Sequence, residues 1–211
     1  MNIYNVIILD ESGSMSSIYR PTIQSMNEVI SGIRKNQKEF PDQRHYVTIV
    51  TFEGNGPEGV KTRRDRVPIQ TVEDFSEIDY CPGGCTPLYD AMGLTLNHLE
   101  SVILPEDKVM ATVITDGYEN SSREYSGKTI KALVSRLREK GWVLAYIGAN
   151  QDAVEVAREL NIKNALNFEA TPEGMSKTAV HFKLASRKMA AAVNGCQALE
   201  DLEDLFEDGK K

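Results

Sequence analysis

Short apolar runs alternate with amphipathic stretches along most of this chain, and the alternation limits the folds that it can adopt. Residues 3–9, 109–115 and 143–147 are apolar almost throughout, which is typical of central strands covered on both faces. Residues 46–52 and 165–168 are two further strand candidates. The pattern predicts an α/β protein with a doubly wound, mostly parallel sheet and helices on both faces.

The stretches between these runs place apolar residues three and four positions apart, as helices with one buried face do. They cover residues 23–33, 88–103, 130–137 and 154–160. A longer last helix is expected after Thr171, because Thr171 can cap it and Pro172 suits its first position.

Residues 54–70 interrupt the alternation. Glycines and a proline predict a turn, and residues 60–69 then read as an antiparallel edge strand. Pro68 and a run of charged residues fit an edge that must resist pairing with other chains. The same basic run is the alternative candidate for an anion site, although charge runs are usually solvated faces.

The composition favours one domain. With 211 residues, 41% of them hydrophobic, the chain can bury one substantial core. We predict a domain over residues 1–196 and an acidic C-terminal tail over residues 197–211, where six acidic residues face two lysines. This tail holds −4 of the net charge of −7. The body is therefore only mildly acidic, which argues against nucleic acid or an anionic membrane as the partner.

We expect a cytoplasmic protein. Its first residues lead straight into a strand without the features of a signal peptide, and no apolar run approaches the roughly 20 residues that cross a bilayer. The three cysteines, Cys81, Cys85 and Cys196, are an odd number and do not resemble a disulfide framework. For Cys81 and Cys85 we expect small buried thiols, because their C-x3-C spacing without further Cys or His nearby is poor for zinc.

Oxygen-bearing side chains gather at points where predicted strands end. Asp10, Ser12 and Ser14 follow the first strand, and Asp116 follows the strand at 109–115. Thr86 stands in a glycine-rich loop just before a predicted helix. In a doubly wound sheet such strand ends form the ligand-binding crevice. Hard oxygen ligands suit Mg2+, Mn2+ or Ca2+ rather than zinc.

The three segments together resemble the von Willebrand factor type A (vWA) family. The pattern D-x-S-x-S, then G-G-x-T-P-L, then T-D-G after an apolar strand occurs here in the family's order. In that family these segments build the metal-ion-dependent adhesion site (MIDAS). Size and the segment G-G-x-T-P-L-Y-D-A also resemble the small bacterial TerY-like members of tellurite-resistance and stress systems.

The resemblance implies a role for each residue. Ser12 and Ser14 would coordinate the metal directly, Thr86 directly or through water, and Asp10 and Asp116 mainly through metal-bound waters. Mg2+ or Mn2+ would then hold an acidic side chain of a protein partner, with Ca2+ less suited. The implied function is metal-bridged protein binding, without catalysis.

Two alternatives remain open. In a haloacid-dehalogenase-like phosphatase Asp10 would be the nucleophile, but Ser12 then stands where a general acid is needed. In a metal-independent scaffold, the edge with Arg63, Arg64 and Arg66 or the acidic tail would bind partners. Residues near the motifs have expectations of their own: a solvated Glu11, an Asp90 that serves its helix dipole, and Glu119 and Asn120 at the rim of the site.

Overall fold

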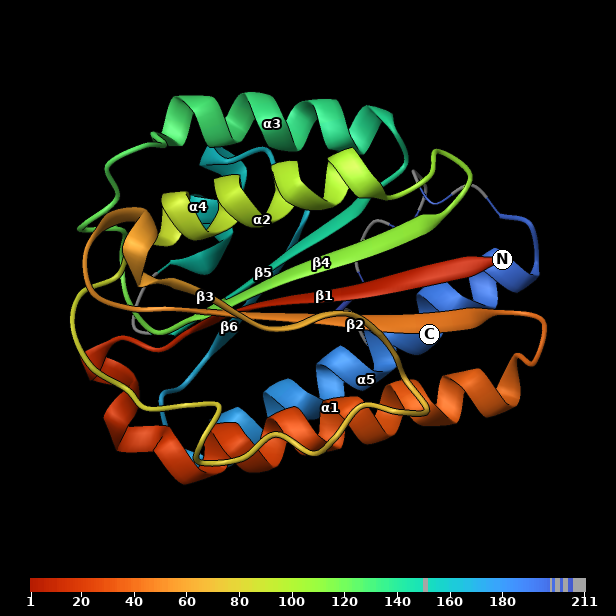
Figure 1. The fold of residues 1–211 in the computed structure, drawn as a ribbon, viewed down its shortest axis with the longest axis horizontal. Coiled ribbons are helices and arrows are strands. Elements are labelled where there is room, and N and C mark those ends of the chain that lie inside the picture. Colours follow the sequence, from red (N-terminus) through yellow and green to blue (C-terminus); the bar gives the residue numbers. More distant parts are fainter. Residues whose placement is uncertain (150–151, 198, 200–201, 203–204, 207–211) are drawn as a thin grey trace.

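The computed structural model describes residues 1–149, 152–197, 199, 202, 205 and 206. Within these residues a mixed sheet is flanked by helices on both faces (Figure 1). The strands are β1 (Asn2–Asp10), β2 (Arg44–Phe52), β3 (Val60–Pro68), β4 (Lys108–Thr115), β5 (Val143–Ala149) and β6 (Asn164–Phe168). The helices are α1 (Tyr19–Glu39), α2 (Leu88–Val102), α3 (Gly127–Glu139), α4 (Ala153–Glu159) and α5 (Pro172–Asn194), with short 3-10 turns η1 (Gly13–Ile18) and η2 (Gly56–Gly59).

The sheet has the strand order β3-β2-β1-β4-β5-β6. Every neighbouring pair is parallel except β2 and β3, which are antiparallel. This confirms the predicted fold class, including its antiparallel edge strand. The strands β2 and β3 lie on one side of β1, and the chain then returns to place β4, β5 and β6 on its other side. The order therefore reverses between β1 and β4, and the carboxyl ends of these two strands border the crevice where such sheets bind ligands.

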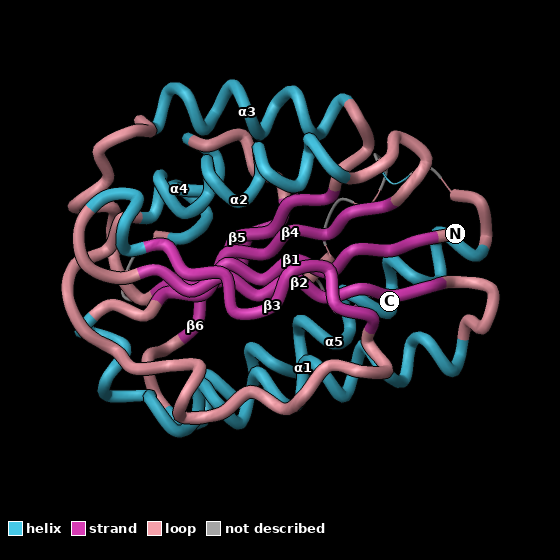
Figure 2. The backbone as a smooth tube through the Cα atoms, viewed as in Figure 1, coloured by secondary structure: helices cyan, strands magenta, loops and turns pink. Residues whose placement is uncertain are grey.

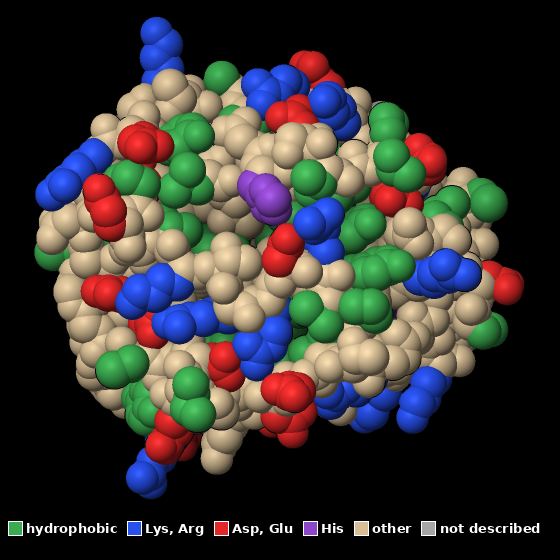
Figure 3. Space-filling model, viewed as in Figure 1, with side chains coloured by type: hydrophobic (Ala, Val, Ile, Leu, Met, Phe, Trp, Pro, Cys, Tyr) green, Lys and Arg blue, Asp and Glu red, His purple; other side chains and the backbone are tan. Residues whose placement is uncertain are grey.

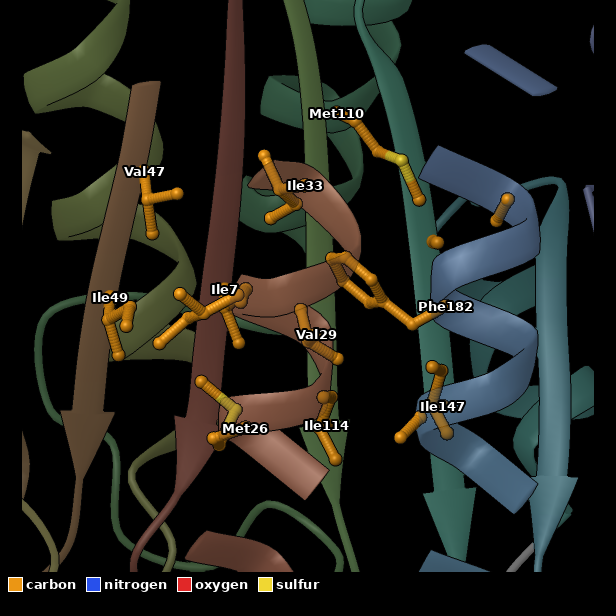
Figure 4. Packing of buried hydrophobic residues seen from close by; sticks show 14 of the residues in the cluster. Ile7, Met26, Val29, Ile33, Val47, Ile49, Met110, Ile114, Ile147 and Phe182 are labelled. Carbon is orange, nitrogen blue, oxygen red and sulfur yellow. The ribbon is translucent and has the colours of Figure 1, made fainter. Parts of the chain in front are cut away.

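Two hydrophobic cores cover the two faces of the sheet. Helices α1 and α5 pack on one face, and α2, α3 and α4 pack on the other (Figures 1 and 2). Figure 4 shows the first core, where Met26 and Val29 of α1 and Phe182 of α5 lie over Ile7 and Ile147 of the strands. The central strands are buried on both faces because helices cover both, as their apolar sequences predict.

Helix α5 begins as its sequence predicts. The Thr171 side chain accepts a hydrogen bond from the Gly174 backbone N–H at 3.0 Å, and Pro172 occupies the first position. Both features satisfy or remove backbone donors that a helix start leaves unpaired. None of the described helices is both long and apolar enough to span a membrane.

Part of the segment predicted as an acidic tail packs on the domain. Leu199, Leu205 and Phe206 are buried in the core that α1 and α5 cover. The Leu205 backbone N–H donates to Asn164 Oδ1 at 3.1 Å, which joins this segment to the start of β6. The six acidic residues of the tail lie outside the described residues.

The edge strand β3 carries internal ion pairs. In the view of Figure 1, β3 lies at the front of the sheet, and basic and acidic groups alternate on that face (Figure 3). The basic run predicted as an alternative anion site is paired with carboxylates of the same chain: Lys61 with Glu53, Arg63 with Glu11, Arg64 with Asp79 and Arg66 with Asp65. These pairs leave little unbalanced positive charge for an anion.

Candidate metal site at the carboxyl edge of the sheet

The fold brings the five predicted site residues to one place. The Ser12 backbone N–H donates to Asp10 Oδ1 at 2.7 Å, and the Ser12 and Ser14 hydroxyls lie 3.1 Å apart. Ser14 Oγ donates to Asp116 Oδ1 at 2.6 Å. A Cβ placed on Gly117 would stand 3.5 Å from Thr86 Oγ1 and 3.9 Å from Ser14 Oγ. Oxygen atoms from three distant segments thus face one small volume beside Gly117.

Asp10 is the most deeply buried member of the group, with a side chain 0% exposed. Its second oxygen, Oδ2, accepts a hydrogen bond of 2.5 Å from Thr115 Oγ1. The Tyr80 hydroxyl donates to the Asp10 backbone carbonyl at 2.8 Å. Thr115 and Tyr80 were not predicted as site residues. The sign in the sequence for Thr115 is a polar residue at the end of an apolar strand, directly before Asp116.

Neither Asp10 nor Asp116 forms an ion pair with any residue that the structure describes. Burial therefore raises the pKa of Asp10 to about 6, although the hydrogen bonds from Thr115 and Ser12 oppose this rise. Burial also raises the pKa of Asp116, which is 4% exposed, and the hydrogen bond from Ser14 offsets part of that rise. Two buried carboxylates without a cation are costly to ionise, so the site is chemically suited to a positive ligand.

The donor chemistry fits a hard divalent cation. Two carboxylates and three hydroxyls supply only oxygen, which Mg2+, Mn2+ and Ca2+ prefer. No group of three or more His, Cys, Asp or Glu side chains suited to a metal occurs in the described part of the chain. A metal at this edge would therefore depend on Ser12, Ser14 and Thr86 as well as on the two aspartates.

Thr86 is held at the site by hydrogen bonds from two other segments. Gly84 O accepts from the Gly13 backbone N–H at 3.1 Å, which joins the two loops directly. Gly84 has φ +64°, and a Cβ there would stand 2.7 Å from the Gly54 backbone nitrogen, so only glycine fits. The Thr86 backbone N–H donates to Asn120 Oδ1 at 2.8 Å. Asn120 thus positions Thr86 from the loop after β4, close to the rim role expected for it.

Asp90, in the first turn of α2, was predicted to interact with the helix dipole, and it also binds the loop after β4. Its carboxylate is fully buried and accepts backbone N–H bonds from Arg123, Glu124 and Tyr125 at 2.8 to 2.9 Å. Glu119 Oε2 likewise accepts from the Tyr89 backbone N–H at 2.8 Å. The loop after β4 is therefore fastened to the first turn of α2. The predicted interaction of Asp90 with the helix dipole is therefore an incomplete explanation of this residue, because its two carboxylate oxygens accept hydrogen bonds from the loop after β4.

The expectation of a solvated Glu11 is wrong. Its side chain is 1% exposed, and Arg63 on β3 donates to both of its oxygens at 2.9 and 3.1 Å. Glu11 Oε1 also accepts from the Cys81 backbone N–H at 2.5 Å, and its backbone carbonyl accepts from Gly83 N–H at 2.8 Å. The buried charge is tolerated because Arg63 neutralises it. Glu11 thereby joins the Asp10 loop, the glycine-rich loop and the edge strand.

The expected burial of the thiols is also wrong. Cys81 and Cys85 are free and exposed, because their loop packs on the site through backbone hydrogen bonds of Gly83 and Gly84 rather than through the thiols. Cys196 is exposed as well. The histidines bring no ligand to the site. His45 is buried beside Asn5 and Gln43, and burial lowers its pKa to about 4.

Residues 6–181 match the family model of the von Willebrand factor type A domain, and the chain belongs to this family. A search of curated protein sequences found no match.

Solved structures share the fold at low sequence identity. Proximal thread matrix protein 1 from the mussel byssus has a TM-score of 0.57 and 17% identity over 88% of this chain and 46% of its own. A von Willebrand factor type A structure from Catenulispora acidiphila has a TM-score of 0.57 and 15% identity, with 89% and 42% covered. The SpRpn10 VWA domain has a TM-score of 0.58 and 12% identity, with 84% and 93% covered. The chain thus spans less than half of the first two proteins, and these likenesses show the fold alone.

Proposed function

We propose that this chain is a metal-dependent protein-binding module. In this proposal Asp10, Ser12, Ser14, Thr86 and Asp116 form a MIDAS that holds Mg2+ or Mn2+, with Ca2+ less suited. The bound cation would offer a coordination position to an Asp or Glu carboxylate of a protein partner. vWA domains are typically protein-interaction modules.

The observation that carries the proposal is the uncompensated charge of Asp10 and Asp116. A purely structural aspartate in a buried place normally has a cationic partner or a full set of donors. Glu11, one residue away, has its arginine, whereas the two site aspartates pair only with neutral groups within the described residues. A divalent cation among the three hydroxyls would neutralise both carboxylates.

The catalytic alternative is less well supported. Each Asp10 oxygen accepts one hydrogen bond, from Ser12 or from Thr115, and the residue is 0% exposed, which disfavours it as a nucleophile toward an incoming substrate. The metal-independent scaffold also loses its main surface, because the arginines at 63, 64 and 66 pair within the chain. We therefore propose a binding protein rather than an enzyme.

We further propose a cytoplasmic scaffold or stress-response adaptor of the TerY-like kind. Three free and exposed thiols suit a reducing compartment. The sequence segment around Thr86 that resembles the TerY-like proteins supports this narrower placement.

Manganese binding tests the site directly, because free Mn2+ is quantified by electron paramagnetic resonance. Wild type is compared with Ser14→Ala and with the control Ser16→Ala, an exposed serine two residues away. We expect Ser14→Ala to weaken Mn2+ binding about tenfold or more, and Ser16→Ala to leave it unchanged.

Binding of a carboxylate to the metal is tested on the same Mn2+-loaded samples. N-acetyl-aspartate amide, but not N-acetyl-asparagine amide, should change the spectrum of protein-bound Mn2+. Equal Mn2+ binding by the Ser14 and Ser16 variants would contradict the site. A metal signal that ignores the aspartate derivative would contradict carboxylate binding.

A further inference from the structure

A pocket of about 350 Å3 lies beside the candidate metal site, between the start of α2, the loop after β4 and helix α4. We propose that this pocket binds a basic side chain, an arginine in preference, of the same partner whose carboxylate reaches the metal. The inference rests on the proposed function and deepens it. It predicts a partner surface on which an acidic residue and a basic residue stand close together.

The pocket shares its walls with the metal site. Tyr89 follows Thr86 by three residues, and Tyr118 and Glu119 follow Asp116 by two and three. The hydrogen bond from the Tyr89 backbone N–H to Glu119 Oε2, at 2.8 Å, joins the two walls. Helix α4, which supplies the far wall, lies over the side of the sheet where the parallel strands end (Figure 1). A single partner surface can therefore reach both places.

The charge of the pocket is negative and uncompensated. Among the described residues, its lining contains Glu119, Asp152, Glu155 and Glu159 but no basic side chain. Glu119 is surrounded by backbone N–H groups and the Ser122 hydroxyl, which bring no full positive charge. Glu155 approaches Arg158 at 3.7 Å in a highly exposed pair, which contributes little screening.

Two tyrosine rings give the pocket a preference for a flat cation. Tyr118 is 59% exposed, unusually open for a large aromatic residue, and Tyr89 is half-buried in the wall. Burial raises the pKa of Tyr89, and the negative charges of Glu119 and Glu159 raise it further. These carboxylates thus act on the same point in the pocket. A guanidinium can stack on a tyrosine ring and pair with carboxylates at once, which a compact ammonium does less well.

The combination of aromatic and acidic groups in the lining argues against an apolar or an acidic side chain as the occupant of this pocket. An apolar side chain would leave the carboxylates near Tyr89 partly desolvated without compensation. An acidic side chain would meet four negative charges. An arginine can stack on the tyrosine rings and pair with the carboxylates. Its long aliphatic stem lets it reach the pocket while the partner's acidic residue binds the metal.

Synthetic peptides test the pocket and the metal site separately. The probes are fluorescent peptides Asp-(Gly)n-Arg with n from 1 to 5. Matched peptides carry asparagine for aspartate, or citrulline for arginine, which keeps the shape and removes the charge. Fluorescence anisotropy measures each affinity at millimolar MgCl2 and again in excess EDTA.

Two double variants locate the effect. Glu155→Gln/Glu159→Gln neutralises the α4 wall of the pocket at exposed positions outside the metal site. Glu73→Gln/Glu106→Gln makes the same change in net charge at exposed positions that do not line the pocket. Comparing them separates local recognition from long-range attraction.

We expect wild type to bind the best arginine peptide about five- to tenfold more tightly than its citrulline match. The preference should fall below about twofold in Glu155→Gln/Glu159→Gln and persist in Glu73→Gln/Glu106→Gln. Equal binding of arginine and citrulline peptides by wild type, or an equal loss in both double variants, would overturn the pocket inference.

The comparisons with asparagine peptides and with EDTA distinguish a failure of the pocket inference from a failure of the proposed function. If the aspartate and Mg2+ effects persist without an arginine preference, the pocket inference fails and the proposed function stands. If the arginine preference appears but neither asparagine nor EDTA weakens binding, the proposed function fails and the pocket assignment stands. If no peptide binds at millimolar concentration, both fail.

Discussion

Substitutions of buried polar residues usually lower the free energy of unfolding. We expect Asp10→Asn to raise it when no metal is present. Asparagine keeps the size of the side chain, and its Oδ1 can still accept from Ser12 N–H. Its amide can donate to Thr115 Oγ1. The Thr115 hydroxyl can then turn to Gly117 O, which already lies 3.0 Å away. The substitution therefore removes a buried negative charge without leaving a polar atom unpaired.

The magnitude follows from the pKa of Asp10. Its pKa rises from 3.8 to about 6 on folding, and one pKa unit corresponds to about 1.4 kcal/mol. Because the folded state holds the proton more tightly than the unfolded state, stability falls as pH rises from about 4 to 6. The metal-free wild type should thus carry a penalty of about 3 kcal/mol above pH 6, and about 1 kcal/mol at pH 4.5.

Urea unfolding in EDTA measures this penalty. At pH 7.5 the Asp10→Asn variant should be more stable than wild type by up to about 3 kcal/mol, and its advantage should shrink by about 2 kcal/mol at pH 4.5. Addition of millimolar MgCl2 should stabilise wild type alone. For a site with a Kd of ~0.1 mM the gain is about 1.4 kcal/mol, or about 3 to 6 °C in Tm.

Two results would refute this reasoning. A variant less stable than wild type in EDTA, by the same amount at both pH values, would mean that the ionised carboxylate stabilises the fold. Equal stabilisation of both proteins by Mg2+ would mean that the cation binds elsewhere.

Other expectations concern the supports of the site and one buried histidine. Thr86→Val should weaken binding of aspartate peptides more than Mn2+ binding, since in the proposed site Thr86 would contact the metal either directly or only through water; equal losses in the two titrations would argue against this. Arg63→Gln should lower the free energy of unfolding by about 2 to 4 kcal/mol, because it leaves Glu11 buried without its cation, and an unchanged urea midpoint would contradict that. His45 has a folded pKa of about 4, below its unfolded value near 6.5, so its neutral ring contributes stability above pH 6.5 that is lost as pH falls toward 4. The total loss is about 3 kcal/mol, and a His45 ring whose NMR resonances titrate near pH 6.5 in the native protein would show the reasoning to be wrong.

The sequence alone determined the fold class and the candidate site. Apolar runs of strand length can be buried on both faces only between helices, so the parallel sheet followed from local patterns. The position of Asp10 and Asp116 at strand ends likewise placed them at one edge of the sheet, because parallel strands end on the same side. The N-terminus of α5 could be read from Thr171 and Pro172, since capping depends on near neighbours alone.

Only the tertiary structure decided which charges are compensated. Glu11 and Asp10 are adjacent carboxylates in the sequence, yet Glu11 meets Arg63 from the edge strand and Asp10 meets only neutral donors. Asp90 is used up by backbone donors of a loop more than thirty residues away. The pocket beside the site unites α2, the loop after β4 and α4, which no local pattern relates. Charge pairing and cavities depend on contacts between distant segments, whereas periodicity and capping depend on neighbours along the chain.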